Sequence, residues 1–426
     1  MELKKYKLAD IANIEISGVD KKTIEGETPV RLCNFVDVYY NWAITKEKAK
    51  SFMLASAKQT EIDKCSIGKG MVAITKDSET RDDIGIATYI ANDFEDVLLG
   101  YHCALITPNP AIVDGKYLNA FMHTRYIQKY FENNASGSGQ RYTLSNDTIG
   151  NIPVLLPSIE VQHTIGKVLS DIDRKIELNK QINDNLETMA KQLYDYWFVQ
   201  FDFPNEEGKP YKSSGGAMVW NENLKREIPQ GWVVEKMGKC TNVLLGGTPD
   251  TNDNSLWGNG YNWLNSGEVA EFPILKSEKN ITPKGLEKSA TVLAPKGSVT
   301  LSITRHLRPS ILCIDACINQ SVVAILENDK VSKEYIYPLL NRDIPRLMSL
   351  RTGAQQPHIN KETVEAINVI LPPANIMGAY INIAESIYNA IFNNAKEVEE
   401  LTKQRDELLP LLMNGQASVN YHLSDD

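Results

Sequence analysis

The residue types that carry out catalysis form no known catalytic motif in this 426-residue sequence. It contains no Walker A phosphate loop, no NPPY- or DPPY-like methyltransferase tetrapeptide, no GxGxxG after a strand and no paired metal-ligand motif. The cysteines show no CxxC pair, so we interpret them as reduced thiols in hydrophobic cores. They are Cys33, Cys65, Cys103, Cys240, Cys313 and Cys317. We therefore expect a protein that is not an enzyme and that holds no metal or cofactor of its own.

Two polar loops that contain glycine and glutamine are better suited to contact a partner. The first is ASGSGQRY (135–142), where the glycines let the backbone approach another molecule closely. The second is TGAQQPH (352–358), where Gln355 falls on Gln140 when the numbers are shifted by 215. A plain linker is the alternative interpretation of such a loop. The recurrence favours a functional one.

The same shift of 215 relates two long segments whose apolar residues recur every seven positions, as in a coiled coil. We expect helices from Ser158 to about Gln200 and from Ala374 to Met413. The recurring positions are Ile165, Ile172, Asn179, Leu186 and Leu193 in the first and Tyr380, Ile387, Asn394, Leu401 and Leu408 in the second. A second apolar row follows three residues later in the first helix, at Val168, Ile182 and Met189. A pattern shared over about 60 residues at one offset indicates an internal duplication.

The polar residues Asn179 and Asn394 occupy equivalent positions near the middle of the two helices. Antiparallel pairing would bring them together, and a buried polar pair would fix the register of the helices. The alternative is that both lie on solvated flanks of imperfect heptads. At about 1.5 Å per residue, about 40 helical residues would span around 60 Å, which suits a spacer or a docking surface.

The duplication extends upstream of the helices. QRYTLSNDTIGNIPVLLP (140–157) and QQPHINKETVEAINVILP (355–372) agree at six of 18 positions. PVRLCNFVDV corresponds to GYNWLNSGEV, which places Asn265 on Asn34 and Glu268 on Asp37, and IGKGMVAI corresponds to PKGSVTL. The loops that follow differ, with TKDSETRDD in the first half and ITRHLRPS in the second. Matching strand segments followed by different loops predict that the two halves contact different targets.

Each half is predicted to have an α/β (α+β) fold. Strand-like runs such as GKGMVAI and YHCALI alternate with turns, and a helix is expected from about Lys116 to Phe131. The predicted boundaries are 1–157 for the first globular domain, 158–203 for the central helix, 204–228 for a polar linker, 229–372 for the second domain, 373–414 for the C-terminal helix and 415–426 for a tail. The aromatic residues that end the central helix are expected to form a hydrophobic plug: Tyr194, Tyr196, Trp197, Phe198, Phe201 and Phe203.

The negative charge of the chain is concentrated in the helices. The net charge is -9, while residues 159–207 carry ten acidic and five basic residues and residues 374–413 carry six acidic and three basic residues. The globular parts are therefore near neutral and can still present basic loops to phosphate. No apolar run approaches the roughly 18 residues that cross a bilayer, and the first residues lack the apolar core of a signal peptide. We expect a cytoplasmic protein.

Three stretches, with the internal duplication, resemble the DNA-specificity subunit of type I restriction–modification systems over essentially the whole chain. They are QLYDYWFVQFDFPNEEGKPYKSSGG with IPQGW, GGTP followed by YNWLNSGEV, and the C-terminal RDELLPLLMNGQ. One feature departs from the family. Members often carry a Glu–Gln pair early in both helices, but only the first helix has it here, as IEVQ, and the second begins PPANIMGAY.

The resemblance implies two target-recognition domains in a pseudo-twofold arrangement, separated by two long antiparallel coiled-coil helices. Each domain would read one half of a split site on double-stranded DNA, and because the loops differ the site would be asymmetric. Two methyltransferase (modification) subunits would be partners, and motor–nuclease (restriction) subunits could join them. S-adenosylmethionine, ATP and magnesium would then belong to these partners, which carry out adenine methylation and restriction.

Within this resemblance, lysine and arginine side chains are expected to bind phosphate, while arginine, glutamine and histidine in the grooves would specify bases. The candidate DNA-binding residues are Lys76, Arg81, Gln140 and Arg141 in the first domain and Arg305, His306, Arg308, Gln355, Gln356 and His358 in the second. For any one of them, a solvated surface side chain is the alternative.

The residues leave two other functions open. One is a self-sufficient DNA methyltransferase or nuclease, which would transfer methyl groups from labelled S-adenosylmethionine without a partner. The other is a structural protein in which the coiled coil is the functional part. Such a protein would show no sequence preference in a DNA selection experiment, even with a methyltransferase subunit present.

Overall fold

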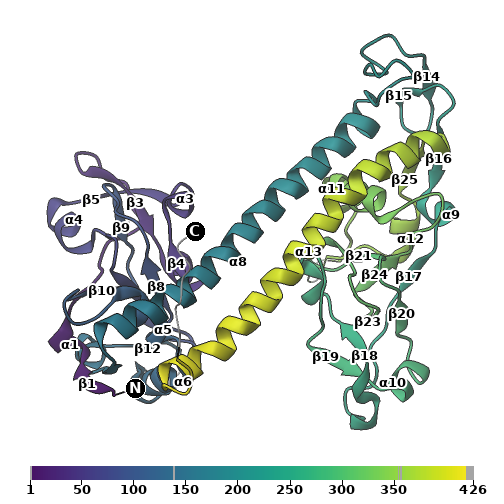
Figure 1. Cartoon of the computed structure of the whole chain (residues 1–426). Coiled ribbons are helices and arrows are strands. Elements are labelled where there is room, and N and C mark those ends of the chain that lie inside the picture. Colours follow the sequence, from purple (N-terminus) through teal and green to yellow (C-terminus); the bar gives the residue numbers. More distant parts are fainter. Residues whose placement is uncertain (1, 138–139, 354, 356, 419–426) are drawn as a thin grey trace. The chain divides into compact units, whose positions relative to one another are not determined.

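Two long helices, α8 (Ile159–Tyr194) and α13 (Ala374–Met413), contribute to both structural units of the chain. The computed structural model describes residues 2–137, 140–353, 355 and 357–418. The first unit comprises Met1–Glu177 with Glu399–Asp426, and the second comprises Leu178–Val398. Each unit therefore combines one α/β portion with a part of both helices (Figure 1).

The first unit is built on a five-stranded sheet with smaller sheets around it. The strand order of the large sheet is β2 (Ala12–Ile16), β10 (Cys103–Pro108), β6 (Val72–Thr75), β8 (Ala87–Ile90) and β4 (Ala43–Ile44). The smaller sheets are β5 (Met53–Ala57) with β3 (Thr28–Cys33) and β9 (Val97–Leu99), β1 (Lys4–Lys7) with β13 (Pro153–Leu156), and β11 (Ser136–Gly137) with β12 (Tyr142–Thr143) and β7 (Asp77–Ser78). The short helices are α1 (Leu8–Ile11), α2 (Phe35–Tyr39), α3 (Lys46–Ala49), α4 (Gln59–Cys65), α5 (Gly115–Met122), α6 (Arg125–Asn134) and α7 (Asn146–Gly150).

The second unit repeats this plan with two four-stranded sheets. Their orders are β17 (Val243–Leu245), β24 (Val322–Ile325), β21 (Val299–Ser302), β22 (Pro309–Ile311), and β19 (Lys279–Ile281), β18 (Trp257–Leu264), β23 (Ala316–Ile318), β20 (Val292–Ala294). The two-stranded sheets are β14 (Met218–Asn221) with β15 (Arg226–Pro229) and β16 (Val233–Lys236) with β25 (Asn368–Leu371). The α-helices besides α8 and α13 are α9 (Met237–Cys240), α10 (Pro283–Glu287), α11 (Lys333–Ser349) and α12 (Lys361–Glu365).

The correspondence predicted between the two halves is confirmed at Asn34 with Asp37 and Asn265 with Glu268. The backbone N–H of Asn34 donates to the Asp37 carboxylate at 2.7 Å, and that of Asn265 donates to Glu268 at 2.9 Å. The central strands β6 and β21 are buried along their whole length. Gly70 and Gly297 precede these strands with φ of 92° and 91°, a conformation that favours glycine.

The two long helices pack antiparallel within each unit. In the second unit, Asn394 donates to the Asn183 side chain at 3.0 Å, and Asn183 donates to the carbonyl of Ile391 at 3.1 Å. In the first unit, the guanidinium of Arg405 lies 3.8 Å from the Asp173 carboxylate. The helix ends also complete the core of the first unit, where the last turns of α13 and the first turns of α8 share one apolar cluster. Its helix members include Ile165, Leu169, Leu409, Leu412 and Met413.

The two asparagines predicted to pair with each other take different partners. Asn179 is buried and donates to the Glu397 carboxylate at 2.8 Å, while Asn394 bonds to Asn183. The polar layer between the helices therefore contains two cross-helix pairs. The second apolar row also differs from the expected helix contact, because Ile182 and Met189 are 38% and 52% exposed.

The start of α8 is fixed by a buried glutamine. The Gln162 amide oxygen accepts from the backbone N–H of Asp114 at 3.0 Å, and its nitrogen donates to the carbonyls of Ile112 and Pro157 at 3.1 and 3.0 Å. The equivalent residue of α13 is Met377, which is also buried. An apolar side chain thus fills the site where the second helix departs from the family pattern, and α13 begins at Ala374 as predicted.

The aromatic plug predicted at the end of α8 is present in the second unit. Five of its six residues are at least 96% buried: Tyr194, Trp197, Phe198, Phe201 and Phe203. Tyr196 is the exception and is 37% exposed. A π-helical turn (Asp195–Val199) follows α8, and Phe201 then adopts φ of 62°, which ends the helix.

Two segments differ from the sequence prediction. The helix expected from Lys116 to Phe131 is two helices, α5 and α6, because the Thr124 hydroxyl caps a new helix by accepting from the Ile127 N–H. The predicted linker 204–228 is folded: Asp202 accepts hydrogen bonds from Ser213, and the β14–β15 hairpin follows. Among the residues described, no helix is long and apolar enough to cross a membrane.

Candidate nucleic-acid interface

Two loops distant in sequence lie side by side in the first unit. Strands β7 and β12 pair antiparallel, with Thr143 opposite Asp77, and the Leu144 N–H donates to the Lys76 carbonyl at 2.8 Å. We call residues 76–83 and 140–143 the first loop pair. The four residues predicted to bind DNA in this half, Lys76, Arg81, Gln140 and Arg141, all belong to it.

The cationic side chains of the first loop pair have defined positions. Lys76 Nζ lies 3.2 Å from the Asp77 carboxylate, and Arg81 stacks 5.0 Å above the centre of the Tyr142 ring, a cation–π contact. Arg141 NH2 lies 2.9 Å from His102 Nε2. Gln140 and Arg141 are exposed, as an interface requires.

Asp77 and His102 are the functional candidates in this unit that the sequence analysis missed. The Asp77 carboxylate is only 10% exposed and forms a short hydrogen bond with His102 Nδ1. Burial alone would raise the pKa of Asp77, but hydrogen bonds from Thr143 and His102 outweigh it and hold the pKa below its ordinary value. A histidine directly before strand β10 was the available signal, yet only the sheet topology shows that it meets Asp77.

The second unit contains the corresponding pair of loops. The Ile359 N–H donates to the Ile303 carbonyl at 3.0 Å, and the Arg305 N–H donates to the Pro357 carbonyl at 3.0 Å. We call residues 303–308, 355, 357 and 358 the second loop pair. It brings together the described candidates predicted for this half, which are all exposed: Arg305, His306, Arg308, Gln355 and His358. The remaining candidate, Gln356, lies outside the described residues.

Arg351 braces the second loop pair and was also missed from sequence. Its NH1 group donates to the carbonyl of Arg305 at 2.7 Å, and its Nε donates to the carbonyl of Met348 at 3.1 Å. Arg305 itself has φ of 54°, so the brace holds a residue in the left-handed region. Position next to TGAQQPH was the only sequence signal for this role.

The two loop pairs share a backbone frame and differ in side chains. Lys76 and Ile303 are equivalent, because their N–H groups donate to the carbonyls of His102 and Ser321, each at 2.9 Å. By the same pairing, Thr304 replaces Asp77 in the second unit. The loop tips also differ in charge: residues 76–83 contain four acidic and two basic residues, whereas residues 303–308 contain two arginines and no acid.

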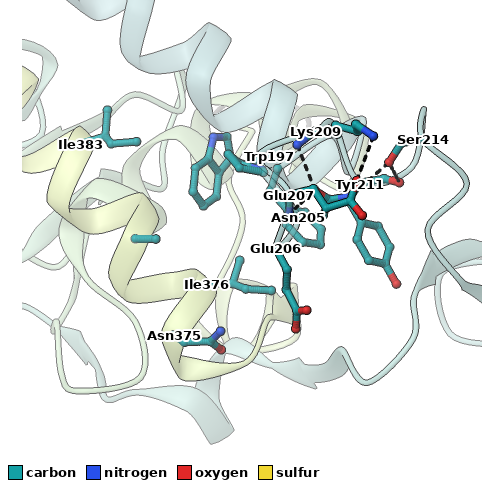
Figure 2. Close-up of a pocket in the computed structure, with 13 residues that line it drawn as sticks. Trp197, Asn205, Glu206, Glu207, Lys209, Tyr211, Ser214, Asn375, Ile376 and Ile383 are labelled. Carbon is teal, nitrogen blue, oxygen red and sulfur yellow. Dashed lines mark hydrogen bonds and ion pairs between the residues drawn. The ribbon is translucent and has the colours of Figure 1, made fainter.

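A separate hollow of about 770 Å³ lies in the second unit, where the end of α8 meets the start of α13. Figure 2 shows Trp197, the α13 side chains Ile376 and Ile383, and the loop that carries Glu206 and Lys209. The helices contribute apolar side chains to the hollow, whereas the loop contributes charged side chains together with the ring of Tyr211. In the described part of the chain, no group of three or more His, Cys, Asp or Glu side chains could hold a metal ion.

A family model described as the type I restriction modification DNA specificity domain matches the sequence twice, over residues 1–188 and 229–403. The chain belongs to this family. Each of the two matches contains one complete loop pair. The duplication seen in the fold is therefore a duplication of this domain.

Named relatives and a solved structure agree with the family assignment. The type I restriction enzyme MjaIX specificity subunit of Methanocaldococcus jannaschii is 25% identical over 322 residues, covering 74% of this chain and 71% of the relative. The HindI specificity subunit of Haemophilus influenzae is 23% identical over 394 residues, covering 80% of this chain and 85% of the relative. The crystal structure of a type I restriction-modification S subunit from M. genitalium has the same fold, with a TM-score of 0.57 at 13% identity, and the match covers 97% of this chain and 96% of that one.

Proposed function

We propose that this chain is the DNA-recognition subunit of a type I restriction–modification complex and that its two loop pairs read two different words of a split site. The observation that carries the proposal is the recurrence of one loop-pair frame with different side chains. Exposed arginine, glutamine and histidine side chains on such a frame suit base edges and phosphate. Unlike loop tips predict an asymmetric site.

Methylation and cleavage would belong to partner subunits. Two methyltransferase subunits would use S-adenosylmethionine and flip an adenine out of the duplex. A motor–nuclease subunit would use ATP and magnesium. The chain would hold none of these cofactors, and alone it would transfer no methyl group from labelled S-adenosylmethionine to DNA.

The exposed row on α8 supports a docking surface for the methyltransferase subunit. Leu178, Ile182 and Met189 are 53%, 38% and 52% exposed, and their spacing of four and seven residues places them on one face. The hollow beside Trp197 would take an apolar side chain of the same partner, with Glu206 favouring a basic neighbour, while Glu207 already pairs with Lys209 at 2.8 Å. Ile182→Lys should prevent copurification with the methyltransferase, while the exposed Lys191→Glu should not.

The test of the proposal is an exchange of one domain. Residues 229–372 would be replaced by the corresponding domain of another family member, and the methylated motif of host DNA would be sequenced. We expect one word to change and the other to persist. Altered preference in both words, or no motif with either chain, would overturn the proposal.

The spacer between the words provides a second test. Removing one heptad from each long helix would shorten the helices by about 10 Å. We expect a shorter spacer with both words retained. A spacer of unchanged length would refute the idea that the helices set it.

A further inference from the structure

Asp77 and Arg141 of the first loop pair are connected through the side chain of His102, and this chain of three side chains ends at the surface. We infer, on the basis of the proposed function, that Asp77 and His102 are positioning residues that hold Arg141 to read a guanine in one of the two DNA words.

Close polar contacts join these three side chains. A carboxylate can only accept, so the His102 nitrogen that faces Asp77, Nδ1, carries a proton. Arg141 NH2 lies 2.9 Å from Nε2 and 3.0 Å from Nδ1, so the guanidinium contacts both ring nitrogens. The imidazole is thus held by a buried anion and in turn contacts the arginine.

The backbone of His102 anchors the chain to the central sheet. Its carbonyl accepts from the Lys76 N–H at 2.9 Å, and its φ of 71° lies in the left-handed region. Histidine and asparagine tolerate this region better than most residues. Arg141 is exposed, but it contacts a residue that directly precedes β10 and that is hydrogen-bonded to the residue directly after β6.

A guanidinium held in this way suits a base better than a phosphate. The contact with His102 uses one N–H of NH2, which leaves the second N–H of NH2 parallel to an N–H of its neighbour, NH1 or Nε, for a second molecule. Two parallel N–H donors match O6 and N7 of guanine in the major groove. Phosphate needs no fixed orientation, and the exposed acids Glu79 and Asp82 of the same loop oppose a phosphate nearby.

The chain of Asp77, His102 and Arg141 belongs to the first copy of the domain. The positions of Asp77 and His102 are occupied by Thr304 and Ser321 in the second unit. Neither can reproduce a carboxylate–imidazole pair. The guanine that depends on this chain is therefore expected in one word only.

The experiment is a selection from duplexes with a randomised centre, using the full chain in complex with its methyltransferase subunit. The wild type is expected to select two words. Arg141→Ala, Asp77→Asn and His102→Gly should each reduce the preference for guanine at one shared position, by roughly 10- to 100-fold for Arg141→Ala. His102→Gly removes the side chain without straining the backbone. Preferences at the other positions should persist.

A conservative variant and charge-matched controls separate positioning from folding. His102→Asn replaces the imidazole with an amide that can still form hydrogen bonds, and asparagine tolerates the left-handed backbone, so this variant should retain more of the guanine preference than His102→Gly. Arg125→Ala and Asp63→Asn change the same charges on exposed residues of the unit outside the first loop pair and should leave the preference intact. Variants are compared only where the melting temperature matches that of the wild type.

Two outcomes overturn the inference alone. One is that Arg141→Ala weakens binding equally on every sequence, as loss of a phosphate contact would. The other is that the guanine preference survives His102→Gly. A wild-type complex that selects no sequence would overturn the proposed function together with the inference.

Discussion

Tyr117 and Tyr335 make the same hydrogen bond in the two copies of the domain. The hydroxyl of Tyr117 donates to the carbonyl of Leu155 at 2.8 Å, and that of Tyr335 donates to the carbonyl of Ile370 at 2.6 Å. Both rings are fully buried. In each copy the bond ties the helix after the central sheet to the strand that leads into a long helix. The duplicated frame is therefore held by a polar contact as well as by its core.

Replacing one of these tyrosines should destabilise its own unit. Tyr335→Phe leaves the Ile370 carbonyl without its buried donor, which should lower the free energy of unfolding by about 1–3 kcal/mol. Urea denaturation followed by tryptophan fluorescence measures this loss. Tyr211→Phe is the matched control, because the Tyr211 hydroxyl bonds to the Ala217 carbonyl at an exposed site. Equal losses in the two variants would contradict the argument.

The stability of the first unit should fall in mild acid because of His123. Its ring stacks on Trp42 at 4.4 Å and contacts the Ala87 carbonyl at 3.0 Å. Burial, together with the nearby charge of Arg405, lowers the pKa of His123 to about 4. In the unfolded chain His123 takes up a proton near pH 6.5, whereas in the folded chain it takes up that proton only near pH 4.

The free energy of unfolding should therefore decrease as pH falls from 6.5 to 4, by at most about 3 kcal/mol. Part of the His123 surface remains accessible, so water reduces that figure. His123→Gln should remove this component of the pH dependence. The control His163→Gln, at a side chain that is 60% exposed, should keep it. An unchanged pH profile in the His123 variant would refute the assignment.

The cross-helix pair Asn183–Asn394 should show energetic coupling. Asn394→Leu removes the donor to the Asn183 side chain and should cost about 1–3 kcal/mol. Adding Asn183→Leu creates an apolar pair, so the double variant should recover part of that loss. A double-mutant cycle by chemical denaturation measures the coupling, and Asn185→Leu, at an exposed position, is the control. Additive losses would mean that the pair contributes nothing to register.

Local repetition explains why much of the fold could be predicted from sequence. The bounds of α13 and the equivalence of Asn34 with Asn265 follow from patterns that recur at fixed offsets. The break between α5 and α6 was missed because the Thr124 cap competes with an apolar spacing that continues through it. Propensity and periodicity favour one helix, while a single hydroxyl starts another.

The candidate site could be predicted only in part. The loops that form it were recognised by their polar residues, but their pairing through the two-residue strands β7 and β12 has no periodic signal. Asp77 and His102 are 25 residues apart and meet because β6 and β10 are neighbours in the sheet. Contacts between residues that are distant in sequence depend on the order of strands in the sheet, and local sequence patterns do not encode that order.

The second loop pair should supply more of the salt-dependent affinity for DNA than the first. Its tip carries Arg305 and Arg308 without an acidic residue, whereas the tip of the first loop pair contains exposed acids. Each phosphate contact contributes a slope of about −0.9 to log K against log salt concentration. Arg305→Ala with Arg308→Ala should therefore weaken binding on every sequence and make the slope less negative by about 2.

Fluorescence anisotropy of the complex on one labelled duplex, measured from low to high salt, gives this slope. The paired control is Arg125→Ala with Arg346→Ala, which removes two arginines that already form ion pairs with Glu132 and Asp343. Because the control lowers the net charge equally, a general field effect would change both slopes alike. If the loop variant instead kept its slope and lost preference for particular bases, the two arginines would read bases rather than bind phosphate.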